Sequence, residues 1–434
     1  MKKHIFAALF CLPSLLNITV VNAESLLQVY EIAAVNDPTV LKAKAQAQAQ
    51  SYQSDTAMSA LLPQINLTMG YTKSNSTSFQ SVSDLTNQVK VQSDTDEFTR
   101  GVSLSQTLFD LGAWNSLDIA DKQALQVRAQ YDEAKQNLIV RVAQGYFNVL
   151  SAIDDLEFSQ AEKRAINRQL EQTKQRYAVG LTAITDVHEA QAQYDNSVAQ
   201  EIITSNSVET AREELREITG KYHKKLSILN TDTFSTVKPA KGSSDFVKVA
   251  QEKNISLQVS KVTVDIAQQQ IKLAQAGHYP KLTLDASYGD SLSDGTINSV
   301  NFDGQPREDS SSIGINFSVP LYSGGATVAA TDQARAFYVS ASQDLETNYR
   351  AITRSVITSY NQVVSDIATY KALEQAVVSA QSALKATEAG FEVGTRTIVD
   401  VLVSTQNLYD AKRNLADVRY RYVLSTLHRL DIKR

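Results

Sequence analysis

Hydrophobic and polar residues alternate in four segments of about ten residues each, although Gln106 interrupts the apolar face of one of them. In the first segment, the apolar side chains on one face are Ile65, Leu67, Met69 and Tyr71. Successive side chains of a strand point to opposite faces, so this period of two predicts strands with one apolar face. The predicted strands are residues 64–73, 98–109, 281–290 and 311–321. An ordinary half-buried antiparallel sheet would explain any one of them taken alone.

Strand length and the connecting segments favour a membrane location for these strands. About ten residues is the length of a tilted strand that crosses a bilayer. The connections at 73–97 and 290–311 are long and rich in Ser, Asn, Asp and Gly, as is typical of outward-facing loops. Four strands cannot close a barrel, and open edges are not tolerated in lipid. We therefore expect several chains to share one barrel. Two chains would give eight strands and three would give twelve. Eight strands leave an interior filled by side chains, so a conducting lumen favours three chains or more.

Two stretches of the chain predict very long helices. Residues 113–176 and 326–392 contain no proline and, away from their ends, Gly145 as their one glycine. Apolar residues such as Val142, Val149 and Leu156 recur at seven-residue spacing, which indicates lateral packing against other long helices. Shorter helices are predicted at residues 25–60, 183–219, 245–277 and 396–430.

The chain contains the same order of elements twice. Residues 62–71 are similar to residues 279–288, and residues 176–187 are similar to residues 390–401. The offsets, 288 − 71 = 217 and 401 − 187 = 214 residues, are nearly equal. Such a constant shift is the mark of a duplicated structural unit. The predicted organisation is a first copy at 24–219, a linker at 220–244 and a second copy at 245–434.

Residues 1–23 have the features of a secretory signal, with Lys2 and Lys3, an apolar run and small residues up to Ala23. Cleavage after Ala23 would remove the one cysteine, Cys11, and leave 40 basic against 47 acidic residues, a net charge of 40 − 47 = −7. This balance does not suit nucleic acid. No later stretch approaches the ~18 apolar residues of a membrane helix, so membrane contact would use the strands.

The sequence contains no pattern that indicates catalysis, a cofactor or a metal site. No phosphate-binding loop, nucleophile elbow or metal-ligand spacing occurs. The histidines of the mature chain are scattered, and each is expected to have a surface or packing role. These are His188, His223, His278 and His428. We therefore expect neither an enzyme nor a cofactor-binding protein.

Six segments together resemble the TolC family of outer-membrane efflux and secretion conduits, over essentially the whole chain. They are LPQINL (62–67), SQTLFD (105–110), YFNVLSAID (146–154), VGLTAITDV (179–187), VVSAQSAL (377–384) and VGTRTIVDVL (393–402). The resemblance implies a homotrimer in the outer membrane, with a twelve-stranded barrel continuous with a helical periplasmic tunnel. It also implies a passive exit duct that a periplasmic adaptor and an inner-membrane pump open at the helical tips.

The turns at 176–187 and 390–401 are the candidate functional site. Gly180 and Gly394 are expected to end the long helices in the left-handed conformation. We expect Thr182 and Thr395 to cap the following helices. Asp186 and Asp400 would then lie early in those helices, where either could simply complement the helix macrodipole.

The resemblance assigns roles to the tip residues. It implies a closed gate held by contacts among Thr185, Asp186, Phe391 and Arg396. Arg396 and Asp186 would form a charge-assisted pair, and our hypothesis is that this pair is the principal latch. It also implies a cation-selective ring of Asp400. The adaptor would dock on Gly180, Leu181, Thr182, Gly394 and Thr395.

The tip departs from the family pattern at two positions. Phe391 replaces a tyrosine, and Val403 replaces a second aspartate, so we expect a single carboxylate ring. A different class of protein, a surface coiled-coil structural protein or adhesin, would explain the long helices. It would not explain the strands or their duplication.

Overall fold

The computed structural model describes residues 23–432, with gaps at 82–87, 232, 299 and 302–306. The predicted signal therefore lies outside the described residues, apart from Ala23. The chain divides into two compact units. The helical unit contains residues up to 38, 138–239 and 362–427, and the sheet unit contains residues 39–137 and 240–361.

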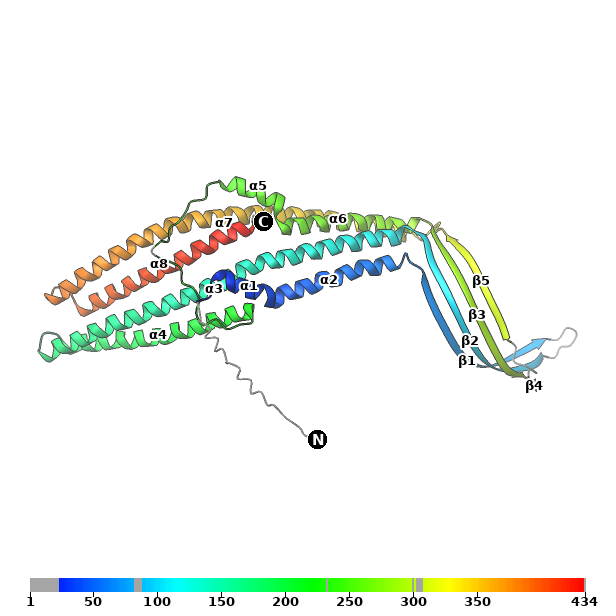
Figure 1. The fold of residues 1–434 in the computed structure, drawn as a ribbon, viewed down its shortest axis with the longest axis horizontal. Coiled ribbons are helices and arrows are strands. Elements are labelled where there is room, and N and C mark those ends of the chain that lie inside the picture. Colours follow the sequence, from blue (N-terminus) through cyan, green and yellow to red (C-terminus); the bar gives the residue numbers. More distant parts are fainter. Residues whose placement is uncertain (1–22, 82–87, 232, 299, 302–306, 433–434) are drawn as a thin grey trace, which may run out of the picture. The chain divides into compact units, whose positions relative to one another are not determined.

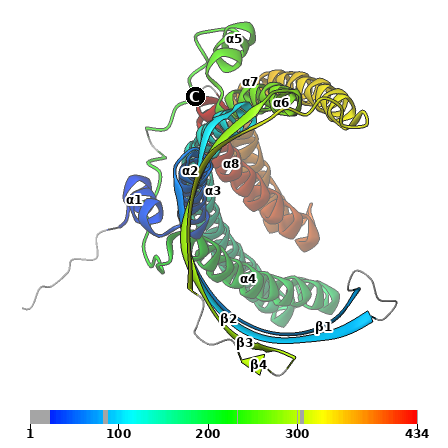
Figure 2. The ribbon, with the colours of Figure 1, turned by 90° about the vertical axis from the view of Figure 1, so that its right-hand side faces the viewer.

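The sheet unit contains an antiparallel sheet of four long strands and one very short strand. The strands are β1 (Gln64–Ser81), β2 (Gln88–Asp110), β3 (Lys281–Ile297), β4 (Val300–Asn301) and β5 (Arg307–Ser318). β2 pairs with β1 and β3, and β3 pairs with β5 as well as with β4. Figure 2 shows how strongly the long strands curve.

The register places the predicted apolar residues of neighbouring strands on one face. Leu67 lies opposite Val102, which lies opposite Tyr288 on the next strand. The other face is polar and small, with Thr68 opposite Gly101. Leu67 is 66% exposed and Tyr288 is 61% exposed, so the apolar face is uncovered in the single chain. A face of this kind is what a membrane-spanning strand presents to lipid.

The strands are longer than predicted, and the expectation of long loops at 73–97 and 290–311 is wrong. β1 and β2 continue as a hairpin in which Lys73 lies opposite Asp96 and Ser81 lies opposite Gln88. Residues 73–78 and 92–97 are polar on both faces, so the period-2 pattern disappears although the backbone ladder continues. β5 ends at Ser318 rather than at 321, because Pro320 has no N–H for the ladder.

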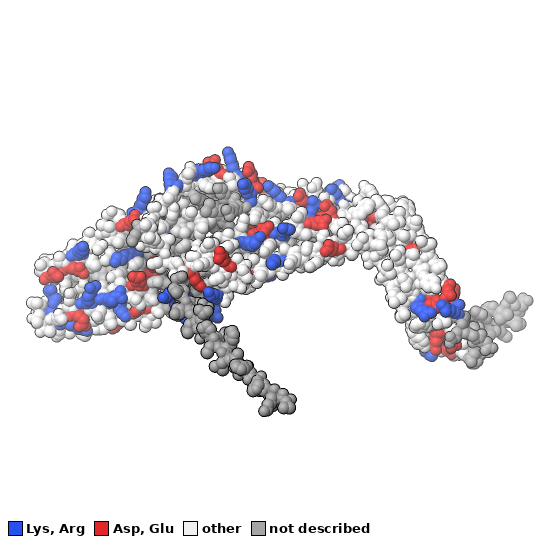
Figure 3. All heavy atoms as spheres, viewed as in Figure 1, with Lys and Arg blue, Asp and Glu red and all other residues white. Residues whose placement is uncertain are grey.

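Charged side chains lie mainly in the far part of the sheet, away from its junctions with the helices. Figure 3 shows a group of basic and acidic atoms there, whereas the part next to the helices is largely uncharged on the face shown. Lys73 forms an ion pair with Asp96 at 3.2 Å. The Nη2 atom of Arg100 lies 2.9 Å from Oδ2 of Asp290 on the neighbouring strand. These cross-strand pairs follow directly from the observed register.

The two long helices are those predicted from the sequence. α3 (Leu111–Ala178) has 68 residues and α7 (Ala326–Glu392) has 67 residues. Each is followed by a turn and an antiparallel helix, namely α4 (Ile184–Thr219) and α8 (Ile398–Ile432). The remaining helices are α1 (Leu26–Asn36), α2 (Pro38–Ser59), α5 (Ser243–Lys253), α6 (Ile255–Gln275) and the short 3-10 helix η1 (Ala276–His278). In the described part of the chain, no helix combines the length and the apolar character needed to cross a membrane.

Two predicted helices are each broken into two. The segment 25–60 breaks at Asp37, because the residue before a proline is disfavoured in the helical conformation. The buried Asp37 carboxylate accepts hydrogen bonds from both Nη atoms of Arg141 on α3, at 3.3 and 2.9 Å. The segment 245–277 breaks at Asn254, whose side chain accepts from the Leu257 N–H and caps α6. A proline therefore decides the first break, and a capping side chain decides the second.

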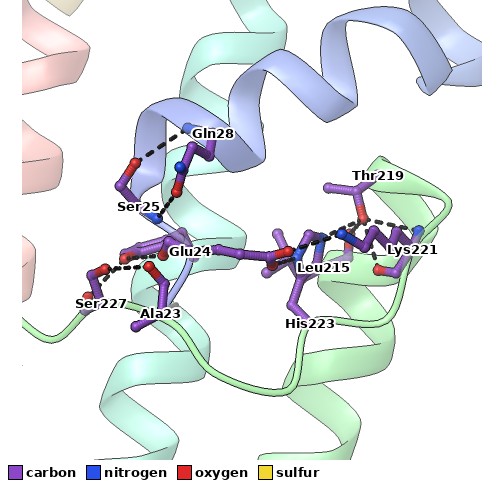
Figure 4. Close-up of polar contacts among 10 residues, drawn as sticks. Ala23, Glu24, Ser25, Gln28, Leu215, Thr219, Lys221, His223 and Ser227 are labelled. Atoms are coloured by element: carbon purple, nitrogen blue, oxygen red, sulfur yellow. Dashed lines mark hydrogen bonds and ion pairs between the residues drawn. The ribbon is translucent and has the colours of Figure 1, made fainter. Parts of the chain in front are cut away.

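Glu24 ties the start of the described chain to the linker between the two copies. Its N–H donates to the Lys225 carbonyl at 3.0 Å, and its carbonyl accepts from the Ser227 N–H at 2.9 Å. The Tyr146 hydroxyl of α3 also donates to the Glu24 carbonyl, at 3.1 Å. Figure 4 shows these segments side by side.

The side chain of Glu24 adds a polar network, which we call the Glu24 knot: Glu24, Thr219, Lys221 and His223. The Lys221 ammonium lies 2.9 Å from one carboxylate oxygen of Glu24, and Nδ1 of His223 is hydrogen-bonded to the other. The buried His223 ring also contacts the Thr219 hydroxyl through Nε2, at 2.9 Å. Figure 4 shows all four side chains converging.

Candidate functional site

The two helix–helix turns of the helical unit have the same backbone structure. After α3, Leu181 N–H donates to the Arg176 carbonyl at 2.8 Å and Gly180 has a φ of 75°. After α7, Thr395 N–H donates to the Gly390 carbonyl at 2.8 Å and Gly394 has a φ of 78°. This 6→1 bond around a left-handed residue is a Schellman motif. The prediction for both glycines is confirmed.

One hydrophobic core joins the two turns, which lie at the same end of the helical unit (Figure 1). Its buried members come from all four helices and are Ile166, Leu170, Ala190, Phe391, Ile398, Val401 and Leu402. Leu170 of α3 and Val401 of α8 are 2% and 0% exposed. The ends of the two hairpins are therefore a single packed body. Displacing one hairpin end would therefore disturb the packing of the other.

Phe391 is a member of this core and is 8% exposed. The Arg176 guanidinium lies over its ring, 4.7 Å from the centroid, in a cation–π contact. The phenyl ring thus stabilises the tip from inside. Sequence reasoning placed Phe391 among the gate contacts and did not foresee its burial.

Asp400 lies in the first turn of α8 and takes part in capping the N-terminus of that helix. Its Oδ2 accepts from the Thr397 N–H at 2.9 Å, and the Asp400 N–H donates to the Thr397 hydroxyl at 3.2 Å. This reciprocal pair is a capping box. Hydrogen bonds from the Thr397 backbone and side chain, with a smaller effect of Arg396, hold the pKa of Asp400 below its ordinary value. Asp400 is therefore an anion at neutral pH.

The expected cap at Thr395 is wrong, because Thr397 caps α8. The Thr395 hydroxyl instead donates to the Gly390 carbonyl, at 3.1 Å, and helps to close the end of α7. The turn after Gly394 is two residues longer than we expected, because α8 begins at Ile398 and not at Arg396. The spacing Thr397-x-x-Asp400 is itself a capping-box pattern that the sequence offered.

The first turn is capped differently. Ala183 takes the N-cap position of α4 and has no side chain that can accept a hydrogen bond. The expected cap by Thr182 is therefore wrong by one residue. The Thr182 hydroxyl donates instead to the Asp186 carboxylate, in the first turn of α4. Asp186 and Asp400 do occupy equivalent helical positions, as predicted, but their partners differ.

The remaining gate candidates are exposed on the single chain. Arg396 and Thr185 are both accessible, and the Arg396 side chain crosses Gly390 so closely that a Cβ there would lie 2.8 Å from Arg396 Cγ. No ion pair joins Arg396 to Asp186 within the described residues of one chain. A latch between protomers would use two chains, so the predicted pair stays a prediction.

The outermost residues of both turns are apolar and exposed. Val179, Leu181 and Val393 are 70%, 67% and 75% exposed. Exposed apolar residues that are gathered at one place are typical of surfaces that contact another protein. Among the residues that the structure describes, no group of three or more His, Cys, Asp or Glu side chains could hold a metal ion.

The comparison with known proteins decides the family. Residues 29–221 and 246–428 match the family described as outer membrane efflux protein. This chain belongs to that family. The two matched segments correspond to the two copies seen in the sequence. The protein is an outer-membrane exit duct, and the adhesin alternative is not supported.

Individual relatives agree with this assignment. Outer membrane protein TolC of Vibrio cholerae serotype O1 is 47% identical over 407 residues, which cover 93% of this chain and 89% of that protein. Alkaline protease secretion protein AprF of Pseudomonas aeruginosa is 31% identical over 403 residues, which cover 92% and 82%. A crystal structure of CusC has the same fold, with a TM-score of 0.77 at 18% identity and coverage of 94% and 91%. The relatives with these names are transport proteins rather than enzymes.

Proposed function

We propose that three copies of this chain form one duct, in which twelve strands close a barrel in the outer membrane and the helices extend it into the periplasm. The uncovered apolar face of the sheet supports this proposal most directly. Residues such as Leu67, at 66% exposure, need lipid on one side, and the edge strands β1 and β5 need partner strands. Three chains satisfy both needs at once.

We infer that the duct is passive and that its cargo comes from an inner-membrane pump through a periplasmic adaptor. Relatives named for efflux and for protease secretion support small molecules and polypeptides as cargo. The adaptor would dock on the tips around Gly180, Leu181, Thr182, Gly394 and Thr395. Their exposed apolar neighbours, Val179 and Val393, support this location. The signal would be removed after Ala23.

The gate would be closed by contacts between protomers at the tips. Arg396 is accessible, has no ion-pair partner in the described part of its own chain, and lies one turn from the carboxylate of Asp400. In the trimer it would pair with Asp186 of a neighbouring chain, next to Thr185. Phe391 would support the latch from below, through the shared core.

Single-channel recording in planar bilayers tests the duct and its latch together. Wild-type trimers should show a small conductance, and Arg396→Glu should raise it several-fold, because like charges would then face one another. The matched control is Arg350→Glu on α7, where an exposed arginine pairs within its own helix. Stable trimers without any conductance would refute the duct, whereas an unchanged conductance in Arg396→Glu would refute only the latch.

A further inference from the structure

A groove of about 580 Å³ lies in the helical unit. It adjoins the hydrophobic core that joins the two turns, which we call the tip core, because its lining residue Tyr194 packs against that core. Its lining residues come from α3, α4 and α8 and are Ala161, Lys163, Arg164, Asn167, Arg168, Tyr194 and Tyr409. α3 provides five of the seven and forms one side, and a tyrosine from each neighbouring helix completes the lining. The size lies within the range of sites for drug-sized molecules.

Two arginines in this groove have uncompensated charges. Lys163 is neutralised by an ion pair with Glu201 of α4. Arg164 and Arg168 lie four residues apart and hence on the same side of α3. Neither has an ion-pair or hydrogen-bond partner among the residues that the structure describes. Both side chains are exposed, whereas the neighbouring Glu162 is paired with Arg413 of α8.

The two tyrosines give the groove apolar walls. Tyr194 packs against the tip core and is half-buried. Burial raises the pKa of the Tyr409 phenol and the Glu162 carboxylate adds to that shift, while the positive charges of Arg168 and Arg164 oppose it. Both guanidinium groups therefore act on the space beside the Tyr409 ring. The groove combines aromatic surface with concentrated positive charge.

We propose that this groove binds an amphiphilic organic anion, a flat apolar body with a carboxylate or sulfonate group. The body would lie between Tyr194 and Tyr409, and the acidic group would accept charge-assisted hydrogen bonds from Arg164 and Arg168. The site is a property of the helical unit and does not depend on conduction. Because its walls belong to both hairpins, and if the proposed gate operates there, occupancy would hold the hairpins together and lower the conductance.

Equilibrium dialysis of the trimer, held in zwitterionic lipid nanodiscs, against 1-naphthalenesulfonate tests the proposal. The sulfonate should bind saturably, and the cation 1-naphthylmethylammonium should not. Arg164→Gln with Arg168→Gln should weaken sulfonate binding about tenfold or more, because two charge-assisted bonds are lost. The control Arg335→Gln with Arg350→Gln removes the same charge from α7 and should leave binding unchanged.

Two results would overturn the proposal. One is equal binding of the sulfonate by the wild type and the Arg164/Arg168 variant. The other is equal binding of glutarate, which has no ring and would indicate a simple anion patch or a contact for acidic peptide. Conductance of the same trimers, recorded with and without the sulfonate, tests the effect on the gate. A lower conductance with the sulfonate would show that the bound anion stabilises the closed gate, whereas an unchanged conductance would show that it binds without affecting the gate. A conducting wild-type trimer that binds no sulfonate would likewise refute the groove site, and it would leave the duct intact.

Discussion

Asp155 of α3 has the most altered acidity among the carboxyl groups of the helical unit. Burial raises its pKa from 3.8 to about 6, and the nearby Asp417 carboxylate of α8 adds to the shift. Arg413 opposes it, and Asp154 adds a smaller push. Asp417 is held in place by the Ser151 hydroxyl at 2.8 Å. The α3–α8 contact therefore contains a carboxyl group that is mainly protonated below a pH of about 6 and ionised above it.

Stability of this contact should fall as the pH rises. The folded chain binds the Asp155 proton more tightly than the unfolded chain, so the stabilising effect is complete below pH 3.8 and is lost as the pH passes 6. Asp155→Asn removes the charge. It should stabilise the protein by about 1–2 kcal/mol at pH 7.5, a value discounted for partial exposure, and have little effect at pH 4.

Thermal unfolding of the wild type and Asp155→Asn at both pH values measures this effect. The control is Asp195→Asn, because Asp195 is exposed on α4. An equal gain in Tm at pH 4 and pH 7.5 would show that the asparagine acts through packing and not through charge.

Some residues of the tip could be predicted individually and others could not. The left-handed glycines follow from local backbone sterics, and the equivalent positions of Asp186 and Asp400 follow from the duplicated turn segments. The cap of α8 depends on where the helix restarts, a matter of two residues that moves the role from Thr395 to Thr397. The burial of Phe391 depends on packing between two hairpins, for which one chain segment contains no signal.

The helix caps make α4 and α8 unequal elements. Thr397→Val removes the hydroxyl of the α8 capping box and should cost about 1 kcal/mol. Ala183→Thr supplies α4 with the hydroxyl that it lacks, at a residue whose φ of −82° and ψ of 157° already suit a cap, and should stabilise by about 0.5–1 kcal/mol.

Apparent Tm of the trimers, together with amide hydrogen exchange at the first turns of both helices, checks these two changes. Exchange should quicken in α8 for the first variant and slow in α4 for the second. Opposite or equal changes in both helices would argue against local capping.

The Glu24 knot joins the first helix to the linker, and its strength should depend on pH. Burial opposes ionisation of Glu24, but hydrogen bonds and charges from His223 and Lys221 outweigh it, so its pKa lies below the ordinary value of 4.5. The stabilisation is present above pH 4.5 and is lost as the pH falls through the lower folded pKa. Glu24→Gln should cost about 0.5–1 kcal/mol at pH 7.

Limited proteolysis of the linker at residues 220–244 reports on the knot. Glu24→Gln should be cut faster than the wild type at pH 7, and the difference should shrink below pH 4. Glu31→Gln, in the exposed part of α1, is the control. Equal cleavage rates at pH 7 would mean that the backbone bonds of Glu24 are sufficient to hold the linker.

At the scale of elements, those helices and strands that have a repeating apolar face could be predicted from the sequence. The long helices and the apolar halves of four strands were correct because packing or lipid requires a repeating face. The polar halves of β1 and β2 have no such requirement, so their pairing was missed. The breaks at Asp37 and Asn254 were missed because a single residue decides each of them, Pro38 in the first case and Asn254 in the second.

In the assembled duct, we expect Asp400 to appear once per chain around the axis. Asp400→Asn retains an oxygen that can accept from Thr397 and removes the charge. The cation preference of the pore should therefore fall towards none while the helix cap survives. Val403→Asp, one turn further along α8, should add a second ring and strengthen the preference.

Reversal potentials in a salt gradient measure both variants. The control is Asp195→Asn, which removes one charge from the exposed face of α4. A selectivity that Asp400→Asn leaves unchanged would place the selective part of the pore elsewhere, for example among the polar side chains on the inner face of the sheet.

The different caps of the two turns have a consequence for whatever meets the tips. Three chains would present six hairpin ends, and these would alternate between a box-capped end at Thr397 and an end at Ala183 with no capping side chain. The ring of hairpin ends would then have threefold rather than sixfold symmetry, because ends with a capped helix would alternate with ends whose helix has no side-chain cap. Six identical partner subunits bound to this ring would therefore occupy two non-equivalent kinds of binding site. Only half of its contacts could share one geometry and one affinity.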